Sequence, residues 1–347
     1  MSFFYQISAT DFSQSAPLTL LPEQYQLQFS ADAGIALCSG KALPLTACAP
    51  FTLASAPIVA VLRVFGAAIS WPQLQQVLQR LGSNVAVAGR CFQPHPKLAK
   101  AIELQLAVLP APDVIAALNT LAQAQGFELV CLSAAPTLHQ PGVLVMDMDS
   151  TAIQIECIDE IAKLAGTGEQ VAAVTARAMN GELDFAQSLI ARVATLQGAP
   201  ETILRQVLEA LPLMPGLTEL VQHLQKYQWQ VAIASGGFTF FTDVLKQRLG
   251  LTATYANVLD IVEGKLTGKV LGDIVDANTK AQVVSQLASD YNIASAQTVA
   301  IGDGANDIPM LNAAALGVAF HAKPKVQAQA KAAIRQGSLL QLLYLLD

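Results

Sequence analysis

At 347 residues the chain is long enough for two or three domains with sizeable cores. Hydrophobic residues make up 53% of it and charged residues 13%, which excludes an intrinsically disordered protein. The formal net charge of −6, without any basic run, excludes an extended nucleic-acid-binding surface.

The cysteines and the apolar segments indicate the compartment. The five cysteines are widely spaced and form no Cys-x-x-Cys pair, which predicts reduced thiols of a cytoplasmic protein and neither a disulfide framework nor a zinc site. Residues 1–6 contain no basic segment before an apolar run, and we expect no signal peptide. No stretch of about 18 uninterrupted apolar residues occurs, so we expect no membrane span.

The N-terminal third predicts a small α+β domain. Residues 1–55 suggest short strands at Leu18–Leu21 and Tyr25–Phe29 and receive no functional assignment. Residues 56–134 then predict strand, helix, strand, strand, helix, strand, the order of a ferredoxin-like split βαβ domain. These six elements are expected at 58–65, 71–81, 84–87, 101–108, 114–124 and 127–132. The domain lacks a Gly-rich phosphate loop, and we expect it to serve regulation or assembly of a homodimer.

A linker and an inserted helical segment follow. Residues 135–142 contain two prolines and a glycine, which is typical of a linker. Val143–Met146 is a short apolar strand. Nothing strand-like then appears before Val231, and helices are expected at 156–164, 170–179, 185–196 and 200–211. We therefore expect a helical lid at about 156–212, inserted into the domain of residues 143–347.

The rest of the chain alternates between helix and strand. Helices are expected at 217–227, 240–249, 278–289, 308–315 and 326–335, and strands at 229–234, 255–262, 266–270, 298–301 and 317–320. This alternation predicts an α/β fold with a doubly wound, Rossmann-type parallel sheet.

Three of the expected strands end in polar residues of complementary kinds. They are followed by Asp147 and Asp149, by Ser235-Gly236-Gly237, and by Asp303, Asn306 and Asp307. Ligands of open parallel sheets lie beyond the carboxyl ends of the strands, so neighbouring strands would bring three carboxylates together. Oxygen donors of this kind suit Mg²⁺, and none of the four histidines lies in these motifs.

Each motif alone also has a simpler interpretation. Asp147-Met-Asp149 is compatible with a solvated acidic turn, and Ser235-Gly-Gly with an ordinary turn. Lys280, near an expected helix start, could offer phosphate a positive charge or lie on a solvated face. Their order along the chain favours the functional interpretation.

Together these motifs resemble those of the haloacid dehalogenase superfamily. The similar segments are Asp147-Met-Asp149-Ser-Thr151, Ser235-Gly-Gly-Phe238, Lys280, Gly302-Asp303-Gly-Ala-Asn306-Asp307, the stretch 156–162 and the lid stretch 178–193. The resemblance covers about residues 142–335. The chain departs from the family pattern at Met148, where the family often has Phe. This residue would contribute its backbone carbonyl, so a different side chain is tolerated there.

The resemblance implies a phosphoryl-transfer mechanism. Asp147 would attack phosphorus and form an aspartyl phosphate, and Asp149 would act as general acid and then as general base. Mg²⁺ would be held by Asp147, by Asp303 and by the main-chain carbonyl of Asp149. Ser235, Gly236 and Lys280 would bind the phosphoryl group, and Asn306 and Asp307 would orient these groups and the water shell of the ion.

The lid stretch implies the substrate, O-phospho-L-serine, which would yield L-serine and phosphate. Glu156 would bind the substrate ammonium group and Arg192 its carboxylate, while Met179 and Phe185 would exclude water. Without the resemblance, Glu156 would be taken as a solvated helix start and Arg192 as a surface charge. The N-terminal domain has the element order of amino-acid-binding, ACT-like regulatory domains.

Two other functions fit the same motifs. A phosphatase or phosphomutase of the same family could act on another small phosphate ester. A non-catalytic amino-acid sensor could use the α/β domain as a scaffold, but the complete set of nucleophile, acid and third carboxylate argues against it.

Overall fold

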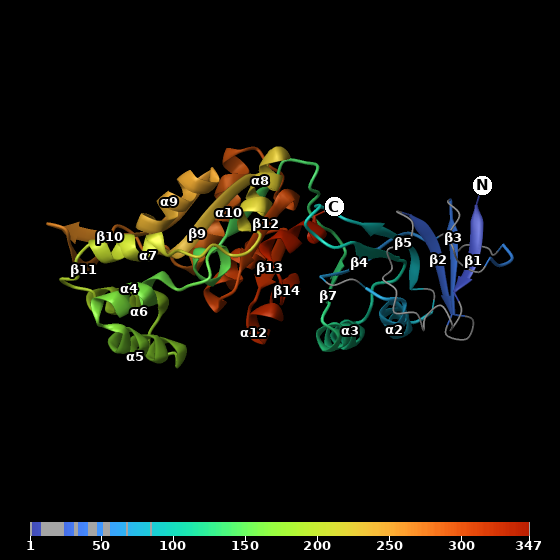
Figure 1. Cartoon of the computed structure of the whole chain (residues 1–347), viewed down its shortest axis with the longest axis horizontal. Helices are drawn as coiled ribbons and strands as arrows, with labels where there is room; N and C mark the ends of the chain where they lie inside the picture. The colour runs from blue at the N-terminus through green and yellow to red at the C-terminus, as the bar shows by residue number, and fades with distance from the viewer. Residues whose placement is uncertain are drawn as a thin grey trace. The chain divides into compact units, whose positions relative to one another are not determined.

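The computed structural model describes residues 2–7, 24–30, 34–40, 47–50, 56–66, 69–83 and 85–346. The chain forms two compact units (Figure 1). Unit 1 comprises Met1–Ala135 and Gln341–Asp347, and unit 2 comprises Pro136–Leu340. The strand expected at Leu18–Leu21 lies outside the described residues.

Unit 1 contains an antiparallel sheet in the order β1-β3-β2-β5-β6-β4-β7. Its strands are β1 Phe3–Ile7, β2 Tyr25–Ser30, β3 Gly34–Ser39, β4 Ala60–Phe65, β5 Ala86–Phe92, β6 Ala101–Leu106 and β7 Glu128–Leu132. Its two helices are α2 Trp71–Leu81 and α3 Pro112–Gln125. The part β5-β6-β4-β7 with α2 and α3 has the ferredoxin-like order, which confirms that expectation. Strands β1 to β3 extend the sheet beyond β5.

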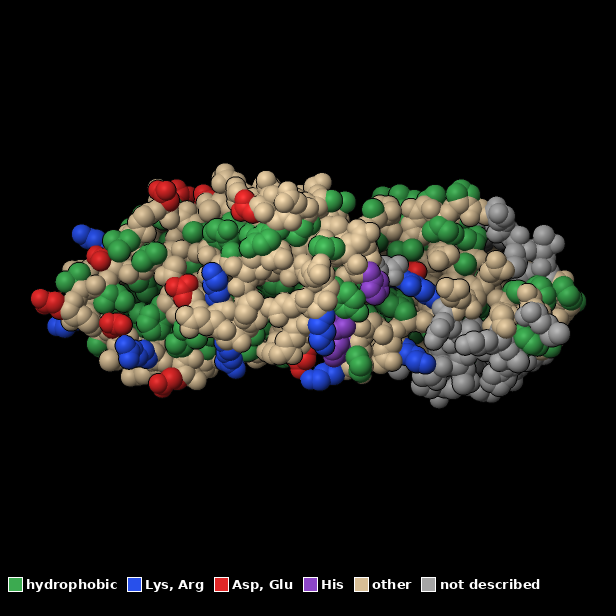
Figure 2. All heavy atoms as spheres, turned by 90° about the horizontal axis from the view of Figure 1, so that it is seen from above, with side chains coloured by type: hydrophobic (Ala, Val, Ile, Leu, Met, Phe, Trp, Pro, Cys, Tyr) green, Lys and Arg blue, Asp and Glu red, His purple; other side chains and the backbone are tan. Residues whose placement is uncertain are grey.

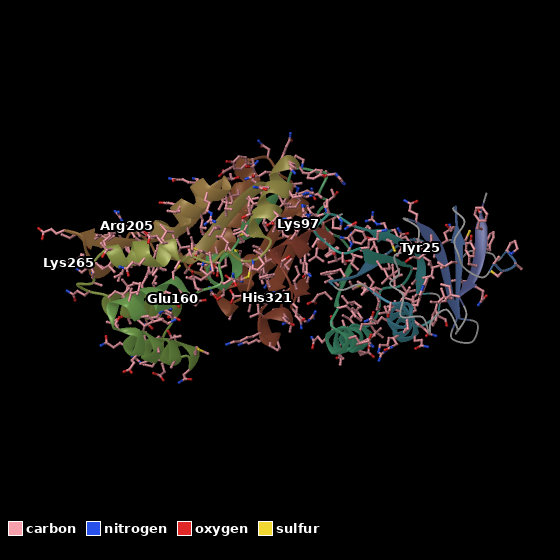
Figure 3. All side chains as sticks on the ribbon, in the orientation of Figure 1. Tyr25, Lys97, Glu160, Arg205, Lys265 and His321 are labelled. Atoms are coloured by element: carbon pink, nitrogen blue, oxygen red, sulfur yellow. The ribbon has the colours of Figure 1, made fainter. Side chains whose placement is uncertain are left out.

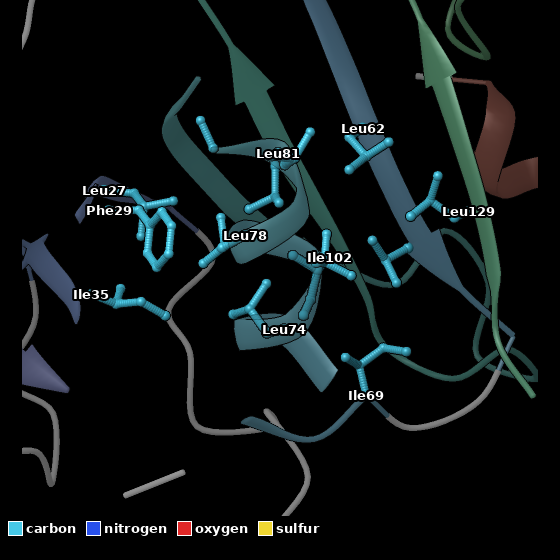
Figure 4. Packing of buried hydrophobic residues seen from close by; sticks show 14 of the residues in the cluster. Leu27, Phe29, Ile35, Leu62, Ile69, Leu74, Leu78, Leu81, Ile102 and Leu129 are labelled. Atoms are coloured by element: carbon cyan, nitrogen blue, oxygen red, sulfur yellow. The ribbon is translucent and has the colours of Figure 1, made fainter. Parts of the chain in front are cut away.

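One face of this sheet carries the core of unit 1. The backbone N–H of Ser70 donates to Gln73 Oε1 at 2.9 Å, and a proline occupies the first turn, so α2 begins at a capped position. Its buried residues recur at helical spacing, as Leu74, Leu78 and Leu81 show. They pack against strand residues that include Leu62, Leu27, Ile102 and Leu129 (Figure 4).

A segment from the far end of the chain completes unit 1. We call Gln341–Leu346 the returning segment; its residues after Gln341 are almost fully buried. The Tyr344 hydroxyl donates to the carbonyl of Ala99 at 2.6 Å, and its ring lies 4.8 Å from that of Phe65. The segment therefore belongs to the packing of unit 1, although unit 2 precedes it in the sequence.

The same region buries an ion network. Arg63 Nε donates to Glu103 Oε2 at 2.9 Å, and Arg63 Nη1 donates to the carbonyl of Tyr344 at 2.9 Å. Arg90 donates to both oxygens of the same Glu103 at 2.9 and 3.1 Å. The Arg63 and Glu103 side chains are 2% and 3% exposed, so this pair is held away from water, whereas the Arg90 side chain is 28% exposed.

Unit 2 contains the predicted α/β sheet, in the order β11-β10-β9-β8-β12-β13-β14. The strands from β10 to β14 in this order pair in parallel, and β11 pairs with β10 antiparallel. The strands are β8 Val143–Met146, β9 Gln230–Phe238, β10 Ala253–Val262, β11 Lys265–Leu271, β12 Thr298–Gly302, β13 Leu316–Phe320 and β14 Ala332–Ile334. The parallel sheet is as expected, and the strands expected at 255–262 and 266–270 form the antiparallel pair β10 and β11.

Helices cover both faces of this sheet. Alternation along β8 turns Val143 and Val145 toward α10 and α11, and Leu144 and Met146 toward the opposite face. The helical elements of unit 2 are η2 Met148–Ala152, α4 Cys157–Ala165, α5 Gly168–Met179, α6 Phe185–Ala194, α7 Thr202–Glu209, α8 Leu217–Lys226, α9 Thr239–Leu249, α10 Ala277–Asp290, η3 Ser295–Gln297, η4 Ala305–Asp307, α11 Ile308–Ala313 and α12 Pro324–Gln327. The last helical element, η5 Leu339–Leu345, begins in unit 2 and continues into the returning segment. The fold is thus doubly wound, as the alternation predicts.

The inserted helices α4, α5 and α6 lie together at one end of unit 2, near α7 and β11 (Figure 1). Glu160 on α4, Arg205 on α7 and Lys265 on β11 mark this end (Figure 3). Charged side chains are scattered over the face shown in Figure 2. Within the described residues, no helix is long and apolar enough to cross a bilayer.

One expected element is wrong. Instead of a helix over Val326–Arg335, the chain forms the short helix α12 and then β14, whose Ala332–Ile334 pairs in parallel with β13. Ala333 and Ile334 are buried there. Pairing with the sheet edge outweighs the helix propensity of this alanine-rich stretch.

Candidate active site

The three motif-bearing strands are neighbours, with β8 between β9 and β12. Met146, the last residue of β8, pairs with Ile233 on one side and with Ile301 on the other. Because the strands are parallel and in this register, the residues after them emerge at the same edge of the sheet. Asp147, Ser235 and Asp303 therefore lie at one site.

A buried lysine links two of the site's carboxylates. Lys280 Nζ lies 2.8 Å from Asp147 Oδ1 and 2.8 Å from Asp307 Oδ1. The Asp276 carboxylate caps α10 by accepting from the Thr279 backbone N–H at 2.8 Å, which fixes the start of the helix at Ala277, three residues before Lys280. Lys280 is 1% exposed and Asp307 is fully buried, so this contact is not a solvated face.

The carboxylates of Asp147, Asp303 and Asp307 could hold a metal ion. One oxygen from each lies within 4.8 Å of the others. Asp307 Oδ2 also accepts from the Gly304 backbone N–H at 2.9 Å, and Thr151 Oγ1 donates to Asp303 Oδ1 at 3.3 Å. A set of oxygen donors without histidine or cysteine fits a hard cation such as Mg²⁺.

Burial and mutual repulsion shift the proton affinities of these acids. Burial and then the Asp307 carboxylate raise the pKa of Asp147 well above its usual range, against the attraction of Lys280. Burial and then Asp307 raise the pKa of Asp303 to about 6. Burial would lower the pKa of Lys280, but the carboxylates of Asp147 and Asp307 outweigh it and raise that pKa. The site thus holds more negative charge than one lysine balances.

Asp149 has a different environment from Asp147. Burial, and then the neighbouring Glu156 carboxylate, raise the pKa of Asp149 to about 7. Its Oδ1 is buried and has no hydrogen-bond partner among the described residues. A carboxyl group with this pKa can give and take a proton near neutrality.

Gly236 and Gly237, which lie within strand β9 just after Ser235, approach their neighbours closely because they lack β-carbons. A Cβ on Gly236 would lie 2.5 Å from Phe185 Cζ, and one on Gly237 would lie 2.7 Å from Met148 Cε. The Asn257 side chain holds this part of β9, since its Nδ2 donates to the carbonyl of Gly236 at 2.9 Å. The two glycines are therefore fixed against the lid and against the loop after β8.

These groups line one small cavity of about 100 Å³. Its lining residues are Asp147, Asp149, Glu156, Ile158, Phe185, Leu189, Arg192, Ser235, Gly236, Gly237, Phe238, Asp303, Gly304 and Asn306. The aspartates and the glycines of β9 contribute one part of the lining, and Glu156, Arg192 and apolar lid residues contribute the rest.

Helix α6 places three lid residues in this cavity, Phe185, Leu189 and Arg192. Asp184 caps the helix by accepting from the Gln187 backbone N–H at 2.8 Å, directly before Phe185. Arg192, two turns later, hydrogen-bonds among the described residues only the Ser188 carbonyl of its own helix, at 3.4 Å. Burial lowers the pKa of Arg192 against the attraction of nearby carboxylates. Its guanidinium group is available to an anionic ligand.

The structure brings together nearly all residues that the sequence assigned to the site. Met179 differs: it lies at the end of α5, is 71% exposed and borders a separate pocket beside Asp159 and Lys163. The site residues that the sequence did not assign are Thr151, Asn257, Ile158 and Leu189. Thr151 belongs to the first motif and could have been found there, whereas Asn257 lies in no motif.

Comparison with known proteins gives similar results for sequence and structure. A family model described as haloacid dehalogenase-like hydrolase matches residues 141–315. A phosphoserine phosphatase of Haemophilus influenzae is 61% identical over 220 residues, which are 63% of this chain and 70% of that protein. The unliganded structure of a probable phosphoserine phosphatase from Vibrio cholerae has a TM-score of 0.71 and 47% identity, and covers 82% of this chain and 86% of that one. A structure described as a phospho-aspartyl intermediate analogue of phosphoserine phosphatase has a TM-score of 0.57 and 36% identity. It covers 60% of this chain and 100% of that one.

Proposed function

The chain belongs to the haloacid dehalogenase-like hydrolases, and on that premise we propose that it hydrolyses O-phospho-L-serine to L-serine and phosphate. One observation carries the choice of substrate. The cavity that contains the phosphoryl-transfer carboxylates also contains Glu156 and Arg192, which match the ammonium and carboxylate groups of an amino acid.

Asp147 is the proposed nucleophile. Both of its hydrogen-bonding contacts, with Lys280 Nζ and with the Met148 backbone N–H, use Oδ1, which leaves Oδ2 to attack phosphorus. The P–O bond to serine breaks as the new bond to Oδ2 forms, and the serine oxygen takes a proton from Asp149. This step gives L-serine and an aspartyl phosphate.

Asp149 then acts in the opposite sense. It takes a proton from a water molecule, which attacks the phosphorus of the aspartyl phosphate and releases phosphate from Asp147. A pKa of about 7 suits a group that must be protonated in one step and ionised in the next. The Ser235 hydroxyl, the Gly236 backbone N–H and Lys280 would bind the phosphoryl oxygens.

Mg²⁺ is the proposed cofactor. Asp147, Asp303 and the main-chain carbonyl of Asp149 would hold it, whereas Asp307 is engaged by Lys280 and by the Gly304 N–H. When bound, the ion offsets the repulsion between the carboxylates and a phosphate dianion. Asn306 and Asp307 would orient the water shell of the ion and the phosphate-binding groups.

The lid would close the site toward water. Phe185 lies against Gly236, and Leu189 lines the same cavity. A water-excluded cavity limits loss of the aspartyl phosphate to side reactions. Met179 would contribute only if α5 moved, because its side chain is now 71% exposed.

A phosphate-release assay tests the proposal. Phosphoserine, phosphothreonine and a sugar phosphate are compared for wild type and Arg192→Ala, with Mg²⁺ and with EDTA. We expect kcat/KM for phosphoserine to fall about 100-fold in Arg192→Ala, and that for the sugar phosphate by less than about twofold. Equal losses would refute the carboxylate clamp. A wild type that prefers the sugar phosphate would identify another phosphatase or phosphomutase of the family.

For unit 1 we propose assembly of a homodimer, with regulation as the alternative role. Four large apolar side chains near the paired ends of β4 and β6 are between 41% and 60% exposed: Ile58, Val59, Val108 and Leu109. β7 is an edge strand of the described sheet. Light scattering gives the mass in solution, and a monomer would refute the dimer. None of the five cysteines forms a disulfide, which supports a cytoplasmic location.

A further inference from the structure

Ser150, directly after the proposed acid Asp149, has an uncommon backbone conformation. Its φ and ψ are 55° and 2°, the left-handed region that side chains with a β-carbon rarely adopt. The other non-glycine described residues with positive φ are Gln228, Glu263, Asn292 and His321, and none of them lines the cavity. A strained backbone beside an active site points to a constraint that the surrounding contacts impose.

The contacts of Ser150 show what this conformation achieves. Its backbone N–H donates to the carbonyl of Ile155 at 3.2 Å, which closes the loop between β8 and α4. Its hydroxyl donates to Glu156 Oε1 at 2.8 Å. An ionised carboxylate can only accept, so the direction of this bond is fixed. One Glu156 oxygen is thereby held, and the other is left for a ligand.

We infer that Ser150 is a positioning residue that aims the Glu156 carboxylate at the substrate ammonium group. The inference rests on the proposed function and extends it. Ser150 is bonded to Asp149 through the chain and to Glu156 through its hydroxyl, so one loop sets the position of both the acid and the ammonium-binding group. Recognition of the amino group is then coupled to placement of the proton donor.

A merely structural role for the hydroxyl makes a different prediction. If Ser150 only stabilised the loop, its loss would displace Asp149 and slow every substrate alike. If it aims Glu156, its loss would weaken binding only of substrates with an ammonium group, mainly through KM. Substrate analogues separate the two roles.

The experiment uses the full chain as wild type, Ser150→Ala and Ser150→Gly. The substrates are phosphoserine, phosphoethanolamine, which lacks the carboxylate, and 3-phosphooxypropanoate, which lacks the amino group. For both variants we expect KM to rise about tenfold with phosphoserine and with phosphoethanolamine, and kcat to change less than about twofold. With 3-phosphooxypropanoate, kcat/KM should change less than about twofold. Ser285→Ala is the control, because the exposed Ser285 hydroxyl donates to the carbonyl of Gln282 in its own helix, away from the cavity.

Three results would overturn the inference. They are equal losses on all three substrates, wild-type KM values in Ser150→Ala, and recovery in Ser150→Gly alone, which would assign the effect to backbone strain. Circular dichroism and the thermal midpoint check that the variants fold. Failure of the wild type to hydrolyse phosphoserine would refute the proposed function instead, and the two failures are therefore distinct.

Discussion

In unit 1 two arginines share the carboxylate of Glu103, whereas in unit 2 the aspartates Asp147 and Asp307 share Lys280. Both networks are buried, and both join residues far apart in the sequence. In the first, Arg63 also donates to the carbonyl of Tyr344. The second has an excess of negative charge, which Asp149, Asp303 and Glu156 increase.

The difference separates a structural network from a functional one. The carboxylate of Glu103 is fully used by its two arginines, so that network is complete without a ligand. In unit 2 burial, and then repulsion from neighbouring carboxylates, raise the pKa values of Asp149 and Asp303 to about 7 and about 6. Burial of charge alone does not mark a function; uncompensated charge beside a cavity does.

The largest expected effect tests the nucleophile. Asp147→Asn should lower phosphate release by at least about 10⁴-fold, because an amide is a poor nucleophile toward phosphorus. Lys280 would still pair with Asp307, so the thermal midpoint should stay within a few degrees. Asp290→Asn, at an exposed position on α10, is the control. Activity of Asp147→Asn within tenfold of wild type would remove Asp147 from this role.

Lys280→Met tests the cation that the two aspartates share. Loss of phosphoryl binding should cost about 10²- to 10³-fold in kcat. The free energy of unfolding should fall by about 3 kcal/mol, because two buried carboxylates lose their cation. Denaturant unfolding and phosphate release measure both effects. A variant that lost only activity would show that Lys280 is not needed for the fold.

Binding of Mg²⁺ should depend on pH. The raised pKa values of Asp303 and Asp149 mean that these carboxyl groups, when protonated, stabilise the metal-free fold. This stabilisation is fully present below about pH 4 and is lost as the pH rises through about 6 for Asp303 and about 7 for Asp149. Mg²⁺ competes with the protons, so we expect a concentration of 100 times Kd to stabilise the protein by about 2.7 kcal/mol at pH 8, and by much less at pH 5.5. Thermal melts with and without Mg²⁺ at both pH values measure this. If Mg²⁺ raised the thermal midpoint equally at both pH values, the ion would bind away from these carboxylates.

Arg63→Met should have the smallest effect and should change stability alone. The substitution removes the bonds to Glu103 and to Tyr344 but leaves Glu103 paired with Arg90, so we expect a loss of about 2 kcal/mol in unit 1. Phosphate release below the unfolding temperature should match that of wild type. A fall in kcat greater than about threefold would show that the network of unit 1 affects the catalytic site, and would contradict the comparison.

Local patterns predicted much of the fold and the carboxylate site. Asp147 and Asp303 each follow a short apolar strand, so the sequence indicates both their element and its end. The sequence places Ser235 after its strand as well, but β9 continues to Phe238. Lys280 follows a capping aspartate, which places it in the first turn of α10. These signals lie within a few residues of the side chains they predict.

The remaining features depend on contacts between distant residues. Asn257 reaches Gly236 across 21 residues, and Arg63 reaches Tyr344 across 281, and no local pattern marks either pair. The strand β14 forms because β13 offers it an edge, which the alanine-rich stretch does not reveal. The outward position of Met179 likewise depends on how α5 packs with α4 and α6.

The returning segment determines the order in which the protein can be finished during synthesis. Chains are made from the N-terminus, and domains generally fold as they emerge. The residues of unit 1 before position 136 are made first, but Tyr344 emerges only after all of unit 2. Until then the carbonyl that accepts from Arg63 is missing, and Phe65 lacks the ring that packs against it. Unit 1 is therefore begun first and completed last.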